Sequence, residues 1–212
     1  MIFDMGIVEI LLILPLLLLS LTVHEYAHGK VAYLMGDPTA TDAGRLSLNP
    51  FKHLDPMGLL MLLMVGVGWA KPVPIDMRRL RMPRRDLIVV SLAGPAANLS
   101  MAALFGIIAR TYRLLAAGGS LPAWQPLFQV LILLTVVNGL LFFFNMLPFA
   151  PLDGSKVVGM LLARRHPQAA DYYFRYSTLL LLAVLVAQIG FDIRIIPFGA
   201  VSELIFRFVM GA

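Results

Sequence analysis

The chain of 212 residues contains no cysteine. Disulfide bonds are therefore excluded, and so is any metal site built on thiolates. A metal ion would have to be held by His, Asp, Glu or water. The same absence leaves the redox state of the compartment undetermined.

Charge is also scarce: 14% of the residues are charged and 59% are hydrophobic, with a mean hydropathy of +0.84. Soluble domains typically carry about 25% charged residues. A soluble fold would lack the polar residues to cover itself, so the composition predicts a polytopic membrane protein with one membrane-embedded domain over 1–212. The net charge of +5 fits basic cytoplasmic loops. No basic face stands clear of the apolar runs, which argues against nucleic-acid binding.

Long apolar runs fit this class. A bilayer crossing takes about 20 residues, and runs that cross or nearly cross are found at 7–34, 87–109, 127–147 and 176–191. Two shorter apolar segments, 57–70 (with Gly58, Gly66 and Gly68) and 195–208, are predicted to be re-entrant, packed against other helices or interfacial. We therefore expect an all-α polytopic membrane protein with about four to six membrane-embedded segments.

The first run is predicted to be a retained helix. Residues 1–6 are acidic, whereas a cleaved signal peptide has a basic start and a small-residue cleavage site. Pro15 is expected to kink this helix, which membrane helices tolerate. After it, residues 36–50 combine turn formers with Thr/Ser/Leu alternation, which predicts a small β-hairpin. Its edge could pair with an extended peptide, and an ordinary connecting hairpin is the alternative.

Loop charges indicate the orientation. Basic residues outnumber acidic ones in 71–86 and 164–175, and the positive-inside rule places both loops in the cytoplasm. The N-terminus and the loop 110–126 would then lie outside, although Arg110 and Arg113 weaken the second assignment. We expect a multi-pass cell-membrane protein. The acidic residues of the N-terminus are Asp4 and Glu9. The basic residues of the two predicted cytoplasmic loops are Lys71, Arg78, Arg79, Arg81, Arg84, Arg85, Arg164, Arg165 and Arg175.

The sequence His24-Glu25-Tyr26-Ala27-His28 directly follows the apolar run. Ionisable groups at membrane depth are expensive and therefore functional candidates. The four-residue spacing puts both His on one helix face, as two ligands of one ion require. HExxH is a zinc-hydrolase signature in which the Glu acts as general base. The alternative is a chance match on a solvated helix end.

A catalytic zinc usually has three protein ligands, so a third is expected. His53 and His166 lie among polar loop residues and are predicted to be solvated. Asp153 is the better candidate, because it follows the run 127–147 in a proline-containing segment that cannot be a regular helix. An Asp-Gly turn at a membrane exit is the alternative.

Membrane depth supports Asp153. His24 is about 17 residues into the first run, roughly 25 Å along a helix axis. The run 127–147 crosses in the same direction and delivers Asp153 near its cytoplasmic end. The candidate ligands can therefore share one level, toward the cytoplasmic side.

These motifs together resemble the site-2 protease family of intramembrane zinc metalloproteases. The resemblance is carried by HExxH in the first hydrophobic segment, by Asn145-x-x-Pro148-x-x-Pro151-Leu152-Asp153-Gly154, by Gly68-Trp69-Ala70-Lys71-Pro72-Val73-Pro74, and by Gly94-Pro95-Ala96-Ala97-Asn98. It covers about residues 20–156, the expected catalytic core, which leaves 157–212 for C-terminal helices. The chain corresponds to a compact form without a PDZ domain or CBS pair.

The resemblance implies one Zn²⁺ held by His24, His28 and Asp153, with Glu25 as general base. It also implies that Asn145 lines the site and helps to hold the substrate or the oxyanion. For Asn98, close helix packing with an interhelical hydrogen bond is favoured over a direct catalytic role.

The implied activity is hydrolysis of peptide bonds in membrane-spanning proteins or peptides, by water that zinc activates and Glu25 deprotonates. Two alternatives are an inactive zinc-binding membrane scaffold and a metal transporter. The intact Glu25 argues against a scaffold. A transporter would need polar residues along a continuous pathway, whereas those found here cluster at one level.

Overall fold

The computed structural model describes residues 7–65, 68–120, 122, 124–191, 193 and 195–211, and these form helices and connecting segments without a strand. The predicted all-helical class is confirmed for this part of the chain. Asp4, Gly66 and the side chain of Glu9 lie outside the described part. The helices are α1 (Ile7–Leu34), α2 (Thr39–Asp42), η2 (Pro50–Lys52), α3 (Pro56–Val65), η3 (Met77–Arg79), α4 (Pro83–Ala117), α5 (Gln125–Asn145), α6 (Asp153–Arg165), α7 (Pro167–Gly190) and α8 (Phe198–Met210).

The predicted apolar runs reappear as helices. α1 has the predicted bounds, α4 encloses the run 87–109, and α5 and α7 overlap the next two. Three of the described helices, α4, α5 and α7, are long and apolar enough to cross a membrane. α3 and α8, with 10 and 13 residues, are too short to span one comfortably. The number of crossings stays a prediction.

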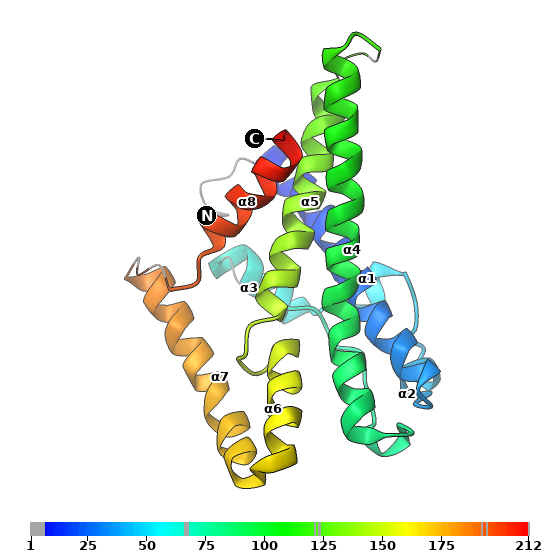
Figure 1. Ribbon diagram of the computed structural model, residues 1–212, viewed down its shortest axis with the longest axis vertical. Coiled ribbons are helices and arrows are strands. Elements are labelled where there is room, and N and C mark those ends of the chain that lie inside the picture. Colours follow the sequence, from blue (N-terminus) through cyan, green and yellow to red (C-terminus); the bar gives the residue numbers. More distant parts are fainter. Residues whose placement is uncertain are drawn as a thin grey trace.

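α4 is the central helix of the fold. It contacts α1, α5, α6 and α8, and it lies alongside α5 as a long pair in Figure 1. Toward its start, α4 joins α1 in a buried apolar cluster that contains Ala32 and Val90. Toward its end, Ala109 forms a second cluster with α5 and α8. The buried polar residues Ser91 and Asn98 of α4 lie between these clusters.

The chain is not helical between α5 and α6. α5 ends at Asn145 and α6 begins at Asp153, and the intervening segment contains Pro148 and Pro151. This confirms the predicted break, since proline lacks the backbone N–H that a helix interior requires. The break places Asp153 at the first turn of a new helix, beside the end of α5.

The predicted β-hairpin at 36–50 is not present, because α2 forms one helical turn there. Asp37 precedes the turn, and its Oδ1 accepts hydrogen bonds from the N–H and hydroxyl of Thr39, where the turn begins. Ala40 is fully buried and its carbonyl accepts from the backbone N–H of Arg45 and Leu46. Local side-chain bonding and burial thus outweigh the alternating pattern.

Asp37 gives a test of how this loop is held. Its carboxylate is 1% exposed, and Oδ2 accepts from the N–H of Asp76 at 2.7 Å. Asp37→Ala leaves these donors unsatisfied, so we expect a loss of about 1–3 kcal/mol of stability. Asp42→Ala is the control, because Asp42 forms an exposed ion pair with Arg79 and should cost about 0–1 kcal/mol. Thermal unfolding of both variants in detergent checks this, and equal losses would contradict it.

Candidate metal centre

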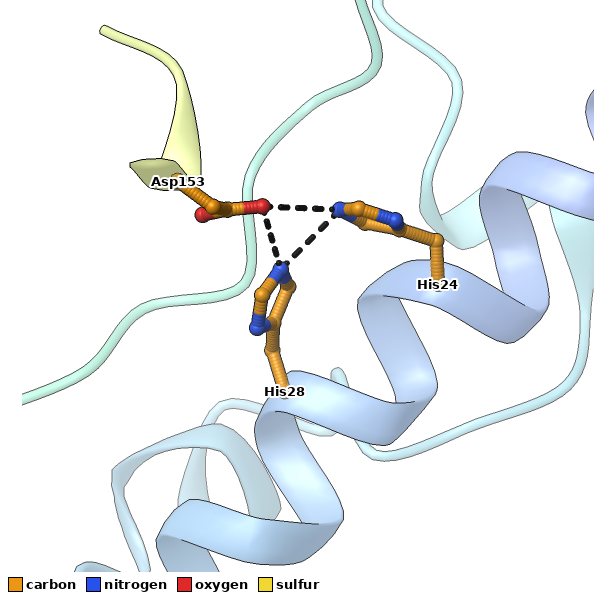
Figure 2. Close-up of side chains that lie close together, drawn as sticks. All are labelled: His24, His28 and Asp153. Carbon is orange, nitrogen blue, oxygen red and sulfur yellow. Dashed lines mark hydrogen bonds and ion pairs between the residues drawn. The ribbon is translucent and has the colours of Figure 1, made fainter. Parts of the chain in front are cut away.

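Three predicted ligands meet in a triangle, shown in Figure 2. Oδ2 of Asp153 lies 3.1 Å from Nε2 of His24 and 3.0 Å from Nε2 of His28. The two Nε2 atoms are 3.0 Å apart. All three residues are buried. They are a group that could hold a metal ion, in which Asp153 lies 125 or more positions from either histidine along the chain.

Each imidazole is oriented by α4 through its other nitrogen. Nδ1 of His24 donates to Oδ1 of Asn98 at 2.5 Å, and Nδ1 of His28 donates to the carbonyl of Val90 at 2.7 Å. Val90 and Asn98 lie on one face of α4, with Gly94 between them. The two His on α1 therefore find their partners along one stripe of the neighbouring helix.

This arrangement fits a cation. Because Nδ1 carries the proton in each ring, Nε2 of a neutral His24 or His28 presents a lone pair. Two lone pairs and a carboxylate oxygen then face one another at 3.0–3.1 Å, and their repulsion is relieved by a metal ion among them or by a proton on one Nε2. Ligand atoms around a tetrahedral zinc are about 3.3 Å apart, given bond lengths of about 2.0 Å.

Gly94 leaves the space that this cluster occupies. A Cβ atom built there would overlap Nε2 of His28 and lie 2.6 Å from Nε2 of His24. α4 can approach the histidines of α1 closely because this position has no side chain. The glycine of the GPAAN motif thus has a steric role at the metal centre.

Asp153 is held by its own helix. Lys156, one turn later in α6, donates to Oδ1 at 2.9 Å, while Oδ2 faces the imidazoles. Gly154 lets the start of α6 pack against the end of α5, since a Cβ there would lie 2.6 Å from the carbonyl oxygen of Leu147. In the Asp-Gly pair, Asp153 is therefore the candidate ligand and Gly154 allows the close approach of α6 to the end of α5.

Glu25 lies beside the cluster and not in it. Its Oε2 accepts a hydrogen bond from the N–H of Val73 at 2.8 Å, and the side chain is half-buried. The segment 68–74 therefore contributes a backbone donor that orients this carboxylate. The role of Glu25 as a base stays a prediction.

The structure does not bring Asn145 into the cluster. It is the last residue of α5, and its Nδ2 donates to the carbonyl of Leu141 at 3.0 Å. His166 is exposed, as predicted. The prediction of a solvated His53 is wrong, because it is 2% exposed and its Nε2 donates to the carbonyl of Ser47. The segment before His53 folds back so that the carbonyl of Ser47 meets the ring. The polar residues around His53 in the sequence do not reveal this burial.

Sequence reasoning gave too small a role to Asn98 and missed Lys156. Asn98 does make an interhelical hydrogen bond, as favoured, but the partner is a candidate metal ligand. Its place in an apolar helix was the available signal, since a fully buried amide must find partners. For Lys156, the signal was an ammonium three residues after the candidate ligand Asp153.

Residues 12–187 match the sequence model described as Peptidase family M50. The chain belongs to peptidase family M50. The resemblance to the site-2 proteases is therefore confirmed, and with it the prediction of a membrane metalloprotease.

The relatives of this M50 peptidase carry matching names. It is 37% identical over 181 residues to "Putative zinc metalloprotease YwhC" of Bacillus subtilis, covering 82% of this chain and 80% of that protein. It is 32% identical to "Putative zinc metalloprotease Rip2" of Mycolicibacterium smegmatis, covering 65% of this chain and 52% of the relative. "Putative zinc metalloprotease Rip3" of Mycobacterium tuberculosis is 34% identical, over 71% of this chain and 31% of the relative. No solved structure matches.

Gly94→Ala tests the shape of the centre. The added methyl overlaps His28 and crowds His24, so we expect the bound metal to fall well below one per chain although alanine favours the helix. Gly199→Ala is the control, because nothing lies within 4 Å of a Cβ there. Metal analysis of the purified proteins checks this. Full occupancy in Gly94→Ala would show that the metal binds elsewhere.

Proposed function

We propose that this M50 peptidase is an intramembrane zinc endopeptidase that cleaves membrane-spanning proteins or peptides. The observation that carries the proposal is the convergence of His24, His28 and Asp153 within 3.1 Å. This set is two imidazoles and one carboxylate, a ligand set typical of catalytic zinc, which leaves one position open. A purely structural zinc is usually enclosed by four protein ligands.

The three side chains would hold one Zn²⁺ through Nε2, Nε2 and Oδ2. When bound, zinc supplies Lewis-acid chemistry, which acidifies water and polarises a carbonyl. Asn98 and Val90 keep both imidazoles in the tautomer that can bind a metal. Lys156 engages Oδ1 of Asp153 and leaves Oδ2 for the metal.

Glu25 would act as the general base. Its position next to His24 in α1 puts it beside the ligand set, and Val73 restrains Oε2. Among the described residues this carboxylate accepts its hydrogen bond through Oε2, which leaves Oε1 to take a proton from the attacking water. The same group would then deliver the proton to the leaving amine.

Asn145 would contact the substrate or the oxyanion after a change of rotamer. In the resting arrangement its amide nitrogen bonds within α5. It lies at the break between α5 and α6, where irregular backbone admits water more readily than a helix does. A helical substrate must unwind locally before attack, because its carbonyls are engaged in backbone hydrogen bonds.

Glu25→Gln separates catalysis from metal binding. Removing the base should lower cleavage of a transmembrane peptide by about 100-fold or more, while zinc stays bound. Asp153→Asn should instead reduce bound zinc, because a neutral amide is a poor ligand. Cleavage and metal content of the purified, detergent-solubilised chain check both statements.

The outcomes also separate the alternatives. Cleavage by Glu25→Gln at the wild-type rate would remove Glu25 as the base, and full zinc in Asp153→Asn would remove that ligand. A wild-type chain that binds zinc without cleaving any tested membrane substrate would favour a scaffold. Metal-dependent transport in vesicles would favour a transporter.

We also propose that the centre opens toward the cytoplasm of a multi-pass cell-membrane protein. The loops 71–86 and 164–175 carry the basic excess that marks the cytoplasmic side. Asp153 begins α6, and α6 ends at Arg165 in the second of these loops. The centre is thus separated from this loop by one short helix.

The absence of cysteine makes this orientation easy to test. The single substitution Arg165→Cys places a thiol on the predicted cytoplasmic side, and Ser120→Cys places one on the predicted outer side. We expect a membrane-impermeant maleimide added to intact cells to label only Ser120→Cys, and to label both after lysis. Labelling of Arg165→Cys in intact cells would reverse the orientation.

A further inference from the structure

A continuous row of buried hydrogen bonds starts and ends on α1. Ser20 donates to the carbonyl of Leu16 at 2.8 Å, and Asn138 of α5 donates through Nδ2 to Ser20 Oγ at 2.9 Å. Asn98 of α4 donates through its own Nδ2 to Oδ1 of Asn138 at 2.8 Å. His24 then donates to Asn98.

We propose that Asn138 and Ser20 are positioning residues of the metal centre, acting through Asn98 to keep Nε2 of His24 free of a proton and aimed at the metal. The proposal rests on the proposed function only in taking His24 as a ligand. Asn138, Asn98 and Ser20 are all 0% exposed. No recognised motif singles out Asn138, and its assignment comes from geometry alone.

The direction of every bond in the row is fixed. Nδ2 of Asn138 also donates to the carbonyl of Leu134 at 2.9 Å, and a carbonyl only accepts. Turning the amide of Asn138 around would place its oxygen against that carbonyl. Oδ1 of Asn138 must therefore face Asn98, where it can only accept, so Asn98 presents Nδ2 to it and Oδ1 to His24.

This fixed direction determines the tautomer of His24. An amide oxygen at Nδ1 requires the proton on Nδ1, which in the neutral ring leaves a lone pair on Nε2. If Asn98 reversed, its NH₂ would face the ring, Nε2 would carry the proton and the ring could not bind a metal there. The second acceptor for Nδ2 of Asn98, the carbonyl of Ser20, is 3.5 Å away. Asn138 is therefore the principal restraint on this amide.

His28 needs no comparable row. Its Nδ1 faces the carbonyl of Val90, a backbone group that cannot turn around. A side-chain amide has two orientations of similar shape, and this ambiguity has to be removed by further partners. This difference explains why polar side chains gather behind His24 in helices that are otherwise apolar.

The test uses Asn138→Leu in the full chain, with Thr135→Val as the matched control. Thr135 lies one turn earlier in α5 and is 2% exposed. Within the described part of the chain, its hydroxyl bonds only to the carbonyl of Leu131 in its own helix. We expect Asn138→Leu to weaken zinc binding, measured by chelator competition, by about 10- to 100-fold. Thr135→Val should leave it unchanged. The visible spectrum of the Co²⁺-substituted protein should change in the first variant and not in the second.

Ser20→Ala keeps the test decisive if Asn138→Leu fails to fold. It removes one hydroxyl and should weaken zinc binding several-fold in the same direction. Where both fold, Ser20→Ala combined with Asn138→Leu should be no worse than Asn138→Leu alone, because the residues act through one row. Unchanged zinc affinity and Co²⁺ spectrum in a folded Asn138→Leu or Ser20→Ala variant would overturn the proposal, even if its melting temperature falls. A wild-type chain that binds no zinc would refute the proposed function instead.

Discussion

The close approach of α1 and α4 at Gly94 is the constraint on which the metal centre depends. A Cβ at this position would collide with both imidazoles. With hydrogen there, Val90 and Asn98 come near enough to hold His28 and His24 from the same helix face. The contact packs two helices and also determines which nitrogen of each neutral histidine presents a lone pair.

The remaining architecture brings the third candidate ligand to this contact. α4 contacts α6 as well as α1, and the proline-containing break after α5 lets α6 begin with Asp153 at that place. Gly154 allows the tight turn against the end of α5. Two glycines and a helix break thus convert residues far apart in sequence into one cluster with 3.0–3.1 Å edges.

The sequence was sufficient for features that depend on composition and local spacing. Hydropathy predicts α1, α4 and α5, and HExxH predicts two ligands on one face of α1. The row through Asn138 was not predictable, because an isolated amide in an apolar run identifies no partner. The expected hairpin at 36–50 is not present, and one of the bonds that hold this segment could not be predicted either. Asp37 accepts from the distant N–H of Asp76, which depends on tertiary packing. Its bond to Thr39 is local.

An amide, and not a carboxylate, accepts the hydrogen bond of His24. Carboxylates often orient metal-binding histidines in other proteins. A carboxylate at the position of Asn98 would place a charge where the side chain is 0% exposed, and burying a charge is costly. A neutral amide avoids this cost but can turn around, so it requires the directional support that Asn138 and Ser20 provide.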